Sequence, residues 1–222
     1  MTVDTLRAGS FADAIRRHRL IVVLRHVAPQ AALLSLVEEL AAAGVHAFEI
    51  PFDTSAATAD LEAVRTLLAK RPGGPFHVGA GTVLRRHDLE AARRAHADFA
   101  ASTLLDPSLV ATATDEGLPF IPGAFTPTEV AAAWAAGATF VKLFPASAAG
   151  PSFVRELRGP MPEPQLIPSG GIDASNALAF LDAGAAAVGI GTAIVRGDAA
   201  TRRMILAAVP PRGDADPPRD GG

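Results

Sequence analysis

Residues 20–50, LIVVLRHVAPQAALLSLVEELAAAGVHAFEI, contain one complete strand–helix–strand unit. Short apolar runs at Leu20–Leu24 and Val45–Ile50 flank Gln30–Ala43, an Ala-rich and Leu-rich segment with helical spacing. Gly44 stands where a helix commonly ends in a positive-φ residue before the chain enters the next strand. Because the strands are almost continuously apolar, the pattern predicts a parallel sheet that is covered on both faces.

The same unit recurs about every 22 residues along the chain. Further strands are predicted at Phe76–Gly79, Asp98–Ala101, Pro119–Ile121, Thr139–Phe144, Gln165–Ile167 and Ala187–Ile190. Further helices are predicted at Phe11–His18, Ala56–Lys70, His87–His96, Pro107–Glu116, Thr128–Ala136, Pro151–Leu157, Ala174–Asp182 and Ala199–Ala208.

Eight strand–helix units predict an α/β fold, a single (β/α)8 TIM barrel with an extra N-terminal helix, over residues 1–209. An open doubly wound sheet is the alternative, although residues 25–29 lack the glycine fingerprint that usually marks its first turn. The tail at residues 210–222, PPRGDADPPRDGG, is rich in proline, glycine and charge, and we expect it to be disordered.

Composition excludes several classes of function. The net charge of the 222-residue chain is −3 and no basic stripe is present, so nucleic acid is not an expected partner. No apolar stretch reaches the roughly 18 residues that a membrane helix needs, and the N-terminus lacks the pattern of a signal peptide. The chain has no cysteine, which excludes disulfides and thiolate chemistry. We therefore expect a cytoplasmic enzyme.

Lys142 is the most informative single residue, because it lies in the apolar run Thr139–Phe144. A buried ammonium is costly to desolvate, so burial favours the neutral amine, which is the nucleophilic form. Such an amine is suited to form a Schiff base with a ketone. A lysine at a strand end whose ammonium reaches solvent or a salt-bridge partner is the alternative.

Other polar residues stand where strands are predicted to end, which is where barrel enzymes carry their active sites. Arg25 closes the first strand, Glu49 lies at the end of the second, and Thr82 follows the third. Glu49 has the parity of Val45 and Ala47, a face of small residues that would point inward. Lysine, carboxylate and arginine at inward strand ends predict one shared pocket, with Glu49 within one water of the Lys142 amine.

The last two strand ends predict a phosphate site. Ser169, Gly170 and Gly171 follow the seventh strand, and Gly191 and Thr192 end the eighth. Glycines let the backbone approach a ligand closely, and a helix from Ala174 would present amide donors at its N-terminus. Phosphate sites after strands seven and eight recur in this type of barrel.

Between Leu20 and Arg196 the chain resembles the bacterial class I aldolases for 2-keto-3-deoxy-6-phosphogluconate and its galactonate epimer. The segments that carry the resemblance, in family order and spacing, are LIVVLRH, AGVHAFEIPFDT, GAGTVL, IPGAFTPTE, KLFPASAAGP, PSGGID and GIGTAIV.

The resemblance implies a role for each residue already singled out. Lys142 would form the Schiff base and Glu49 would be the general acid and base, while Arg25 and Thr82 would bind the pyruvyl carboxylate. Phe144 would pack beside the lysine. Gly170, Gly171 and Thr192 would hold the phosphate. The resemblance also implies a homotrimer that needs no metal and no cofactor.

Two departures from the family pattern concern the substrate. Asp53 stands where gluconate-type members usually have an arginine that binds the carboxylate, so we expect Asp53 to point away from the pocket or to pair with a neighbouring cation. The family's Ser/Thr-Pro turn after the fourth strand is replaced by Ser102-Thr103-Leu104.

The expected activity is cleavage of the phosphorylated keto acid to pyruvate and glyceraldehyde 3-phosphate. One alternative is an aldolase for 4-hydroxy-2-oxoglutarate or another 2-keto acid. A second is a phosphate-binding barrel or a phosphosugar isomerase that forms no imine.

Overall fold

The computed structural model describes residues 3–213, with side chains from Phe11 onward. Its strands are β1 (Leu20–Val23), β2 (Ala47–Pro51), β3 (His77–Gly81), β4 (Ala100–Ala101), β5 (Phe120–Ile121), β6 (Gly123–Ala124), β7 (Val141–Leu143), β8 (Leu166–Pro168) and β9 (Val188–Ile190). Its helices are α1 (Val3–His18), α2 (Gln30–Ala42), α3 (Ala57–Ala69), α4 (Arg86–Arg94), α5 (Pro107–Asp115), α6 (Pro127–Ala135), α7 (Ala146–Arg158), α8 (Ala177–Asp182), α9 (Thr192–Arg196) and α10 (Ala199–Ala208).

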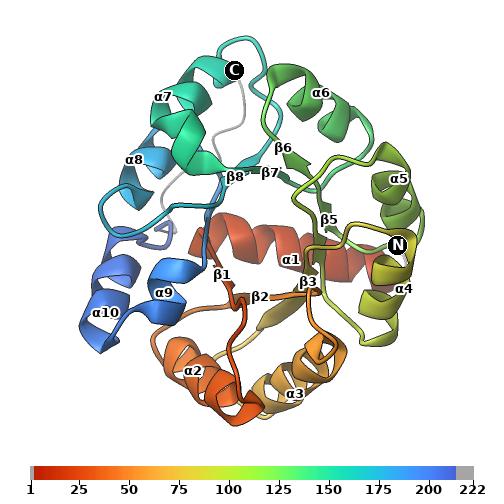
Figure 1. The fold of residues 1–222 in the computed structure, drawn as a ribbon. Helices are drawn as coiled ribbons and strands as arrows, with labels where there is room; N and C mark the ends of the chain where they lie inside the picture. The colour runs from red at the N-terminus through yellow and green to blue at the C-terminus, as the bar shows by residue number, and fades with distance from the viewer. Residues whose placement is uncertain (1–2, 214–222) are drawn as a thin grey trace.

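The described strands form a curled parallel sheet with helices outside it (Figure 1). They pair in two ladders, in the orders β5-β4-β3-β2-β1-β9 and β6-β7-β8. The parallel α/β class is confirmed, but the ladders do not make one ring of eight strands. A parallel bridge between Ser169 and Gly189 brings the end of β8 next to β9.

The predicted fifth strand, Pro119–Ile121, corresponds to β5, and the short strand β6 follows it after Pro122, which has no N–H to give to a ladder. Its carbonyl still accepts a hydrogen bond from the Lys142 N–H, with an N–O distance of 2.8 Å. The segment therefore continues past the break, and it places Gly123 opposite Lys142.

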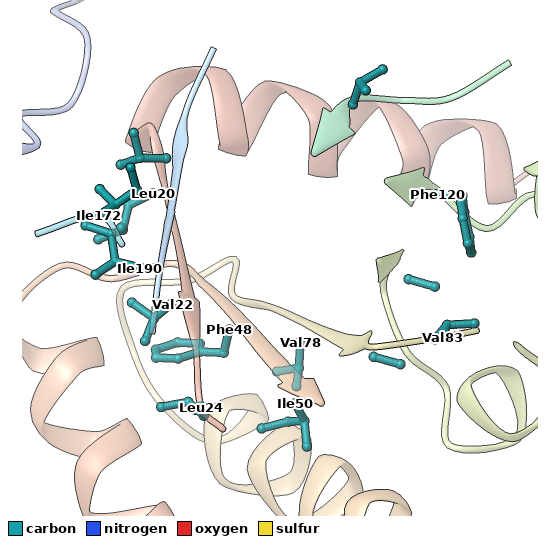
Figure 2. Close-up of a cluster of buried hydrophobic side chains, with 14 of the residues drawn as sticks. Leu20, Val22, Leu24, Phe48, Ile50, Val78, Val83, Phe120, Ile172 and Ile190 are labelled. Atoms are coloured by element: carbon teal, nitrogen blue, oxygen red, sulfur yellow. The ribbon is translucent and has the colours of Figure 1, made fainter. Parts of the chain in front are cut away.

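Strand side chains alternate between two hydrophobic layers. The outer layer packs against the helices and includes Val22, Phe48, Val78 and Val141; Figure 2 labels the first three among the side chains that β1, β2, β3 and β9 contribute. The inner layer fills the centre of the curled sheet with Ile21, Ala47, Phe99, Ala101, Ile121, Phe140 and Ile167. Glu49 and Lys142 have the inward parity, because they lie two residues beyond Ala47 and Phe140.

Helix α1 packs under the inner layer and crosses behind the strands in Figure 1. Phe11 is fully buried, and its ring stacks on Phe99 with centroids 4.5 Å apart and meets Phe140 edge-on at 6.2 Å. Arg16 adds polar ties: its Nε donates to Gln165 Oε1 at 2.9 Å, and its guanidinium lies over the Phe140 ring. The helix thus keeps water from the side of the sheet interior opposite the strand ends.

Local sequence sets the starts of the helices that follow β4 and β6. The Asp106 carboxylate accepts hydrogen bonds from the first amides of α5, and Pro107 occupies the first helical position, where no N–H is needed. Thr126 and Glu129 form a capping box at the start of α6. Hydrogen bonds from the N–H groups of Phe125 and Thr126 hold the pKa of Glu129 below its ordinary value.

The structure differs from the sequence prediction at several element boundaries. Helix α7 begins at Ala146 rather than Pro151, because a first turn precedes the kink at Gly150, whose φ is 74°. Helix α8 begins at Ala177 rather than Ala174, and the five-residue α9 was not predicted. At the expected tail, the Arg212 N–H donates to the Arg17 carbonyl at 2.8 Å, and residues 214–222 lie outside the described part.

Within the described residues, none of the helices combines the length and the apolar character needed to cross a membrane.

Phe11→Ala should lower the free energy of unfolding by about 3–5 kcal/mol, because it removes a fully buried ring from the inner layer. Met204→Ala is the matched control, since Met204 is 64% exposed and should change stability by no more than about 0.5 kcal/mol. Urea denaturation measures both. Equal small losses would show that α1 does not seal the sheet interior.

Candidate active site

Lys142 on β7 and Glu49 on β2 face each other inside the curled sheet. The Lys142 Nζ lies 3.1 Å from Glu49 Oε1 and 3.3 Å from Oε2. The two side chains are only 6% and 3% exposed. The expectation that Glu49 lies within one water of the amine is confirmed, and the contact is direct.

Strand β3, next to β2, leaves space for the Glu49 carboxylate because it ends in a glycine. Glu49 pairs in register with Val23 of β1 on one side and with Gly79 of β3 on the other. Gly81, at the end of β3, lies against the carboxylate, and a Cβ at that position would overlap Glu49 Oε1. Any larger residue at Gly81 would therefore displace Glu49 from Lys142.

Burial and pairing act in opposite directions on these two charges. Desolvation costs several kcal/mol for each ion, and close pairing offsets that cost only when the geometry is good. Transfer of one proton from Nζ to the carboxylate removes both charges at once and leaves a neutral amine beside a carboxylic acid. A neutral amine attacks carbonyl carbons, and a carboxylic acid protonates the oxygen that must leave.

Arg25, Thr82 and Asp53 come together where β1, β3 and β2 end. Arg25 Nη2 donates to Thr82 Oγ1 at 3.0 Å, and Arg25 Nη1 forms an ion pair with Asp53 Oδ2. His26 Nε2 lies 3.2 Å from the same Asp53 oxygen. The expectation that Asp53 pairs with a neighbouring cation is confirmed. The cation is Arg25, the residue that was expected to bind the substrate carboxylate.

Thr82 and His26 have unusual backbone conformations. Their φ angles are 56° and 54°, in the left-handed region that β-branched residues such as threonine rarely adopt. Residues held in such conformations cluster at functional sites. At Thr82 the conformation coincides with the hydrogen bond that its hydroxyl accepts from Arg25.

The predicted phosphate-binding residues lie at the ends of β8 and β9. Gly170 and Gly171 have φ angles of 90° and 75°, and a Cβ at Gly170 would lie 3.0 Å from the Phe144 ring. The buried Ser169 lies between three strand ends, because its N–H donates to the Leu143 carbonyl of β7 at 3.0 Å and it forms a parallel bridge with Gly189 of β9. The Gly171 N–H donates to no backbone acceptor among the described residues.

Gly191 and Thr192 complete this end of the site. Gly191 is the N-cap residue of α9, and Thr192 is the first residue of that helix. A Cβ at Gly191 would lie 3.2 Å from the Val23 carbonyl oxygen, so the end of β9 packs directly on β1.

The expectation that a helix begins at Ala174 is wrong, because α8 begins at Ala177. Residues 173–176 form a hydrogen-bonded turn, in which the Ser175 N–H donates to Asp173 Oδ1 at 2.8 Å and the Asp173 N–H donates to Asn176 Oδ1 at 3.0 Å. Hydrogen bonds from the hydroxyl and then the N–H of Ser175 hold the pKa of Asp173 below its ordinary value. These two amides are occupied, so the amide of Gly171 is the better anion donor.

Sequence reasoning missed two contributors to the glycine loop. The Ser147 N–H donates to the Gly170 carbonyl at 3.0 Å, and Ser147 Cβ packs where a side chain at Gly171 would lie. Asn176 Nδ2 donates to the Gly171 carbonyl at 2.9 Å. Ser147 was missed because the sequence did not predict that α7 begins as early as Ala146.

A separate cavity of about 600 Å³ lies at the N-terminal ends of β3, β4 and β5, away from Lys142. Its walls include two ion pairs, Arg65 with Asp98 at 2.8 Å and Arg93 with Glu116 at 2.9 Å. It contains none of the site residues named above. In the described part of the chain, no three His, Asp or Glu side chains are grouped so that they could hold a metal ion.

Known proteins resemble this chain over most of its length. A family model described as KDPG and KHG aldolase matches residues 11–205. The 2-dehydro-3-deoxy-phosphogluconate aldolase of Haemophilus influenzae is 35% identical over 150 residues, which are 67% of this chain and 68% of that protein. The 2-dehydro-3-deoxy-6-phosphogalactonate aldolase of Escherichia coli is 30% identical over 185 residues, 83% of this chain and 88% of that protein.

A solved structure agrees with these relatives. The KDPG aldolase of Legionella pneumophila, with pyruvate captured as a covalent carbinolamine, is 26% identical and has a TM-score of 0.76. The match covers 89% of this chain and 96% of that one.

Lys142→Met should cost about 3–5 kcal/mol of stability, because it leaves the Glu49 carboxylate buried without a partner. The double variant Lys142→Met/Glu49→Leu should recover most of that loss, since it removes both charges. Arg86→Met breaks the exposed pair with Glu90 and should cost less than about 1 kcal/mol. Urea denaturation measures the free energy of unfolding of each variant. Additive losses in the double variant would contradict the pairing.

Proposed function

The chain belongs to the KDPG and KHG aldolase family, and from that membership we propose that it is a class I aldolase, a carbon–carbon lyase. Its proposed reaction is cleavage of 2-keto-3-deoxy-6-phosphogluconate, or of the galactonate epimer, to pyruvate and glyceraldehyde 3-phosphate. The observation that carries the proposal is the direct contact between Lys142 Nζ and the buried Glu49 carboxylate.

In the first step, the neutral amine of Lys142 attacks the C2 ketone to form a carbinolamine. Glu49 takes the proton that the Lys142 ammonium gives up before the attack and donates it to the carbinolamine hydroxyl, which leaves as water. The product is an iminium ion bonded to Nζ. The contact of 3.1 Å lets the same carboxylate serve each proton transfer at this atom.

In the second step, the iminium ion accepts the electron pair of the C3–C4 bond. The Glu49 carboxylate takes the proton of the C4 hydroxyl, the bond breaks, and glyceraldehyde 3-phosphate departs. The enamine that remains is protonated at C3, and water hydrolyses the resulting imine to pyruvate and the free amine. No step requires a cofactor.

The two ends of the substrate bind at opposite sides of the reacting lysine. We assign the carboxylate to Arg25 and Thr82, which are already hydrogen-bonded to each other. We assign the phosphate to Ser169, Gly170, Gly171, Gly191 and Thr192, with support from the Gly171 N–H, which donates to no backbone acceptor among the described residues. Phe144, whose ring packs on Gly170, would form the wall between Lys142 and the phosphate.

A second substrate, 4-hydroxy-2-oxoglutarate, stays a candidate, because the matching family model is described as KDPG and KHG aldolase and a similar solved structure is named as an aldolase for both substrates. The lysine chemistry would be the same. A phosphosugar isomerase or a phosphate-binding barrel without activity is not retained, because the matching family model is described as KDPG and KHG aldolase.

At the level of the whole molecule, we propose that residues 1–209 form one closed (β/α)8 barrel with α1 across its N-terminal end. The Ser169–Gly189 bridge and the hydrogen bond from the Ala186 N–H to the Leu166 carbonyl, 2.9 Å long, support closure between β8 and β9. We also propose a cytoplasmic homotrimer that acts on small molecules, on the strength of the family resemblance.

A coupled assay of pyruvate release tests the function against the gluconate epimer, the galactonate epimer and 4-hydroxy-2-oxoglutarate. At least one phosphorylated epimer should be cleaved with a higher kcat/KM than 4-hydroxy-2-oxoglutarate. Cleavage of 4-hydroxy-2-oxoglutarate alone would establish the second candidate. Release of pyruvate from none of the three would overturn the aldolase proposal.

Glu49→Gln should slow turnover of the preferred substrate by roughly 10²–10⁴, the usual contribution of a general acid and base. The amide keeps the shape of the side chain but cannot exchange protons with Lys142. Glu90→Gln, on the exposed face of α4, is the matched control and should retain full activity. Near-normal turnover by Glu49→Gln would remove Glu49 from the mechanism.

A further inference from the structure

Asp53 competes for the guanidinium that is assigned to the substrate carboxylate. Both terminal nitrogens of Arg25 already donate: Nη1 to Asp53 and Nη2 to Thr82. A guanidinium has five N–H donors, so other N–H groups are available to a ligand. A carboxylate that binds to them lies beside a second carboxylate, and the two negative charges repel each other.

Asp53 is built into this position. Its side chain is 20% exposed, less than the 42% of Arg25, so the chain encloses the acid more than the base. Its two partners, Arg25 and His26, follow β1, and Arg25 is in turn hydrogen-bonded to Thr82, which follows β3. His26, which contacts Asp53, and Thr82, which contacts Arg25, both have backbone conformations that are uncommon for residues other than glycine, with φ angles of 54° and 56°.

The glycine loop at Gly170 and Gly171, at the other end of the site, is better suited to bind an anion. In this loop, the Gly171 N–H donates to no backbone acceptor among the described residues. An anion gains an unshared donor at the glycine loop and a shared donor at Arg25. The two ends of the site are therefore unequal in their attraction for an anion.

We propose that Asp53 is a specificity-determining residue that weakens binding of the pyruvyl carboxylate while it holds Arg25 in place. This inference rests on the proposed aldolase function. Bare pyruvate then binds weakly and is released readily as a product. A substrate that carries a second anion at its far end is retained, because the glycine loop binds that anion. The substrate class that this arrangement favours is a keto acid with a phosphate at the other end.

Exchange of the methyl protons of pyruvate with deuterium from solvent isolates the carboxylate end. Pyruvate condenses with the Lys142 amine and loses water, the imine loses a C3 proton to Glu49, and the enamine takes up a deuteron. Hydrolysis then returns labelled pyruvate and the free amine. Proton NMR in D2O measures the rate against pyruvate concentration, and no phosphate takes part.

Asp53→Asn should lower the half-saturating concentration of pyruvate by about tenfold, because the amide can still accept from Arg25 but carries no charge. The saturated exchange rate should stay within about twofold, since neither Lys142 nor Glu49 is changed. Pyruvamide, which lacks the carboxylate charge, should show the same half-saturation in wild type and variant. A role in structure alone would shift both ketones together.

Asp13→Asn is the matched control, because Asp13 forms an ion pair with Arg16 at 3.0 Å on α1, and it should leave pyruvate half-saturation unchanged. Asp53→Ser repeats the test if Asp53→Asn melts at a lower temperature than wild type. An unchanged or higher half-saturation for pyruvate in the Asp53 variants overturns the proposal. Absence of exchange in the wild-type protein would instead overturn the imine mechanism itself, so the two failures are distinguishable.

Discussion

The contact between Lys142 Nζ and the Glu49 carboxylate, 3.1 Å long inside the curled sheet, is the constraint on which the rest of the site depends. Two buried charges survive only if they stay paired, and the pair stays together only if β2 and β7 hold their registers. Two features of the fold keep the pair in place. Helix α1 packs Phe11 under the inner layer, and Gly81 leaves room for the carboxylate.

Local patterns in the sequence were sufficient to place this pair. The parity of Val45, Ala47 and Glu49, and of Phe140 and Lys142, correctly assigned both charges to the interior, because strand side chains alternate strictly. The apolar runs and the glycine at position 44 located most strands and helices to within a few residues. Element type is fixed largely by such short-range periodicity, which one sequence contains in full.

What the sequence did not reveal depends on contacts between distant segments. Residues 25 and 53 are far apart along the chain, and nothing in either segment indicates that Asp53 meets Arg25 rather than another cation. The early turn of α7 before Gly150 depends on hydrogen bonds from the N–H groups of Ala146 and Ser147 to the carbonyls of Ser169 and Gly170. A helix from Ala174 was expected to present its amides to a ligand, but the Asp173 N–H donates to the Asn176 side chain and the Ser175 N–H donates to the Asp173 side chain. The same contacts that escaped prediction distinguish the two ends of the site.

The central claim is that the amine of Lys142 forms an imine with a 2-keto acid, and the chain is well suited to a direct measurement. It contains two lysines, Lys142 and Lys70, and Lys70 lies exposed at the end of α3. Incubation with pyruvate and borohydride, followed by peptide mass spectrometry, locates any reduced adduct. The account predicts one stable adduct, on Lys142, and none in Lys142→Met. An adduct on Lys70 or on the N-terminal amine, with Lys142 unmodified, would contradict it.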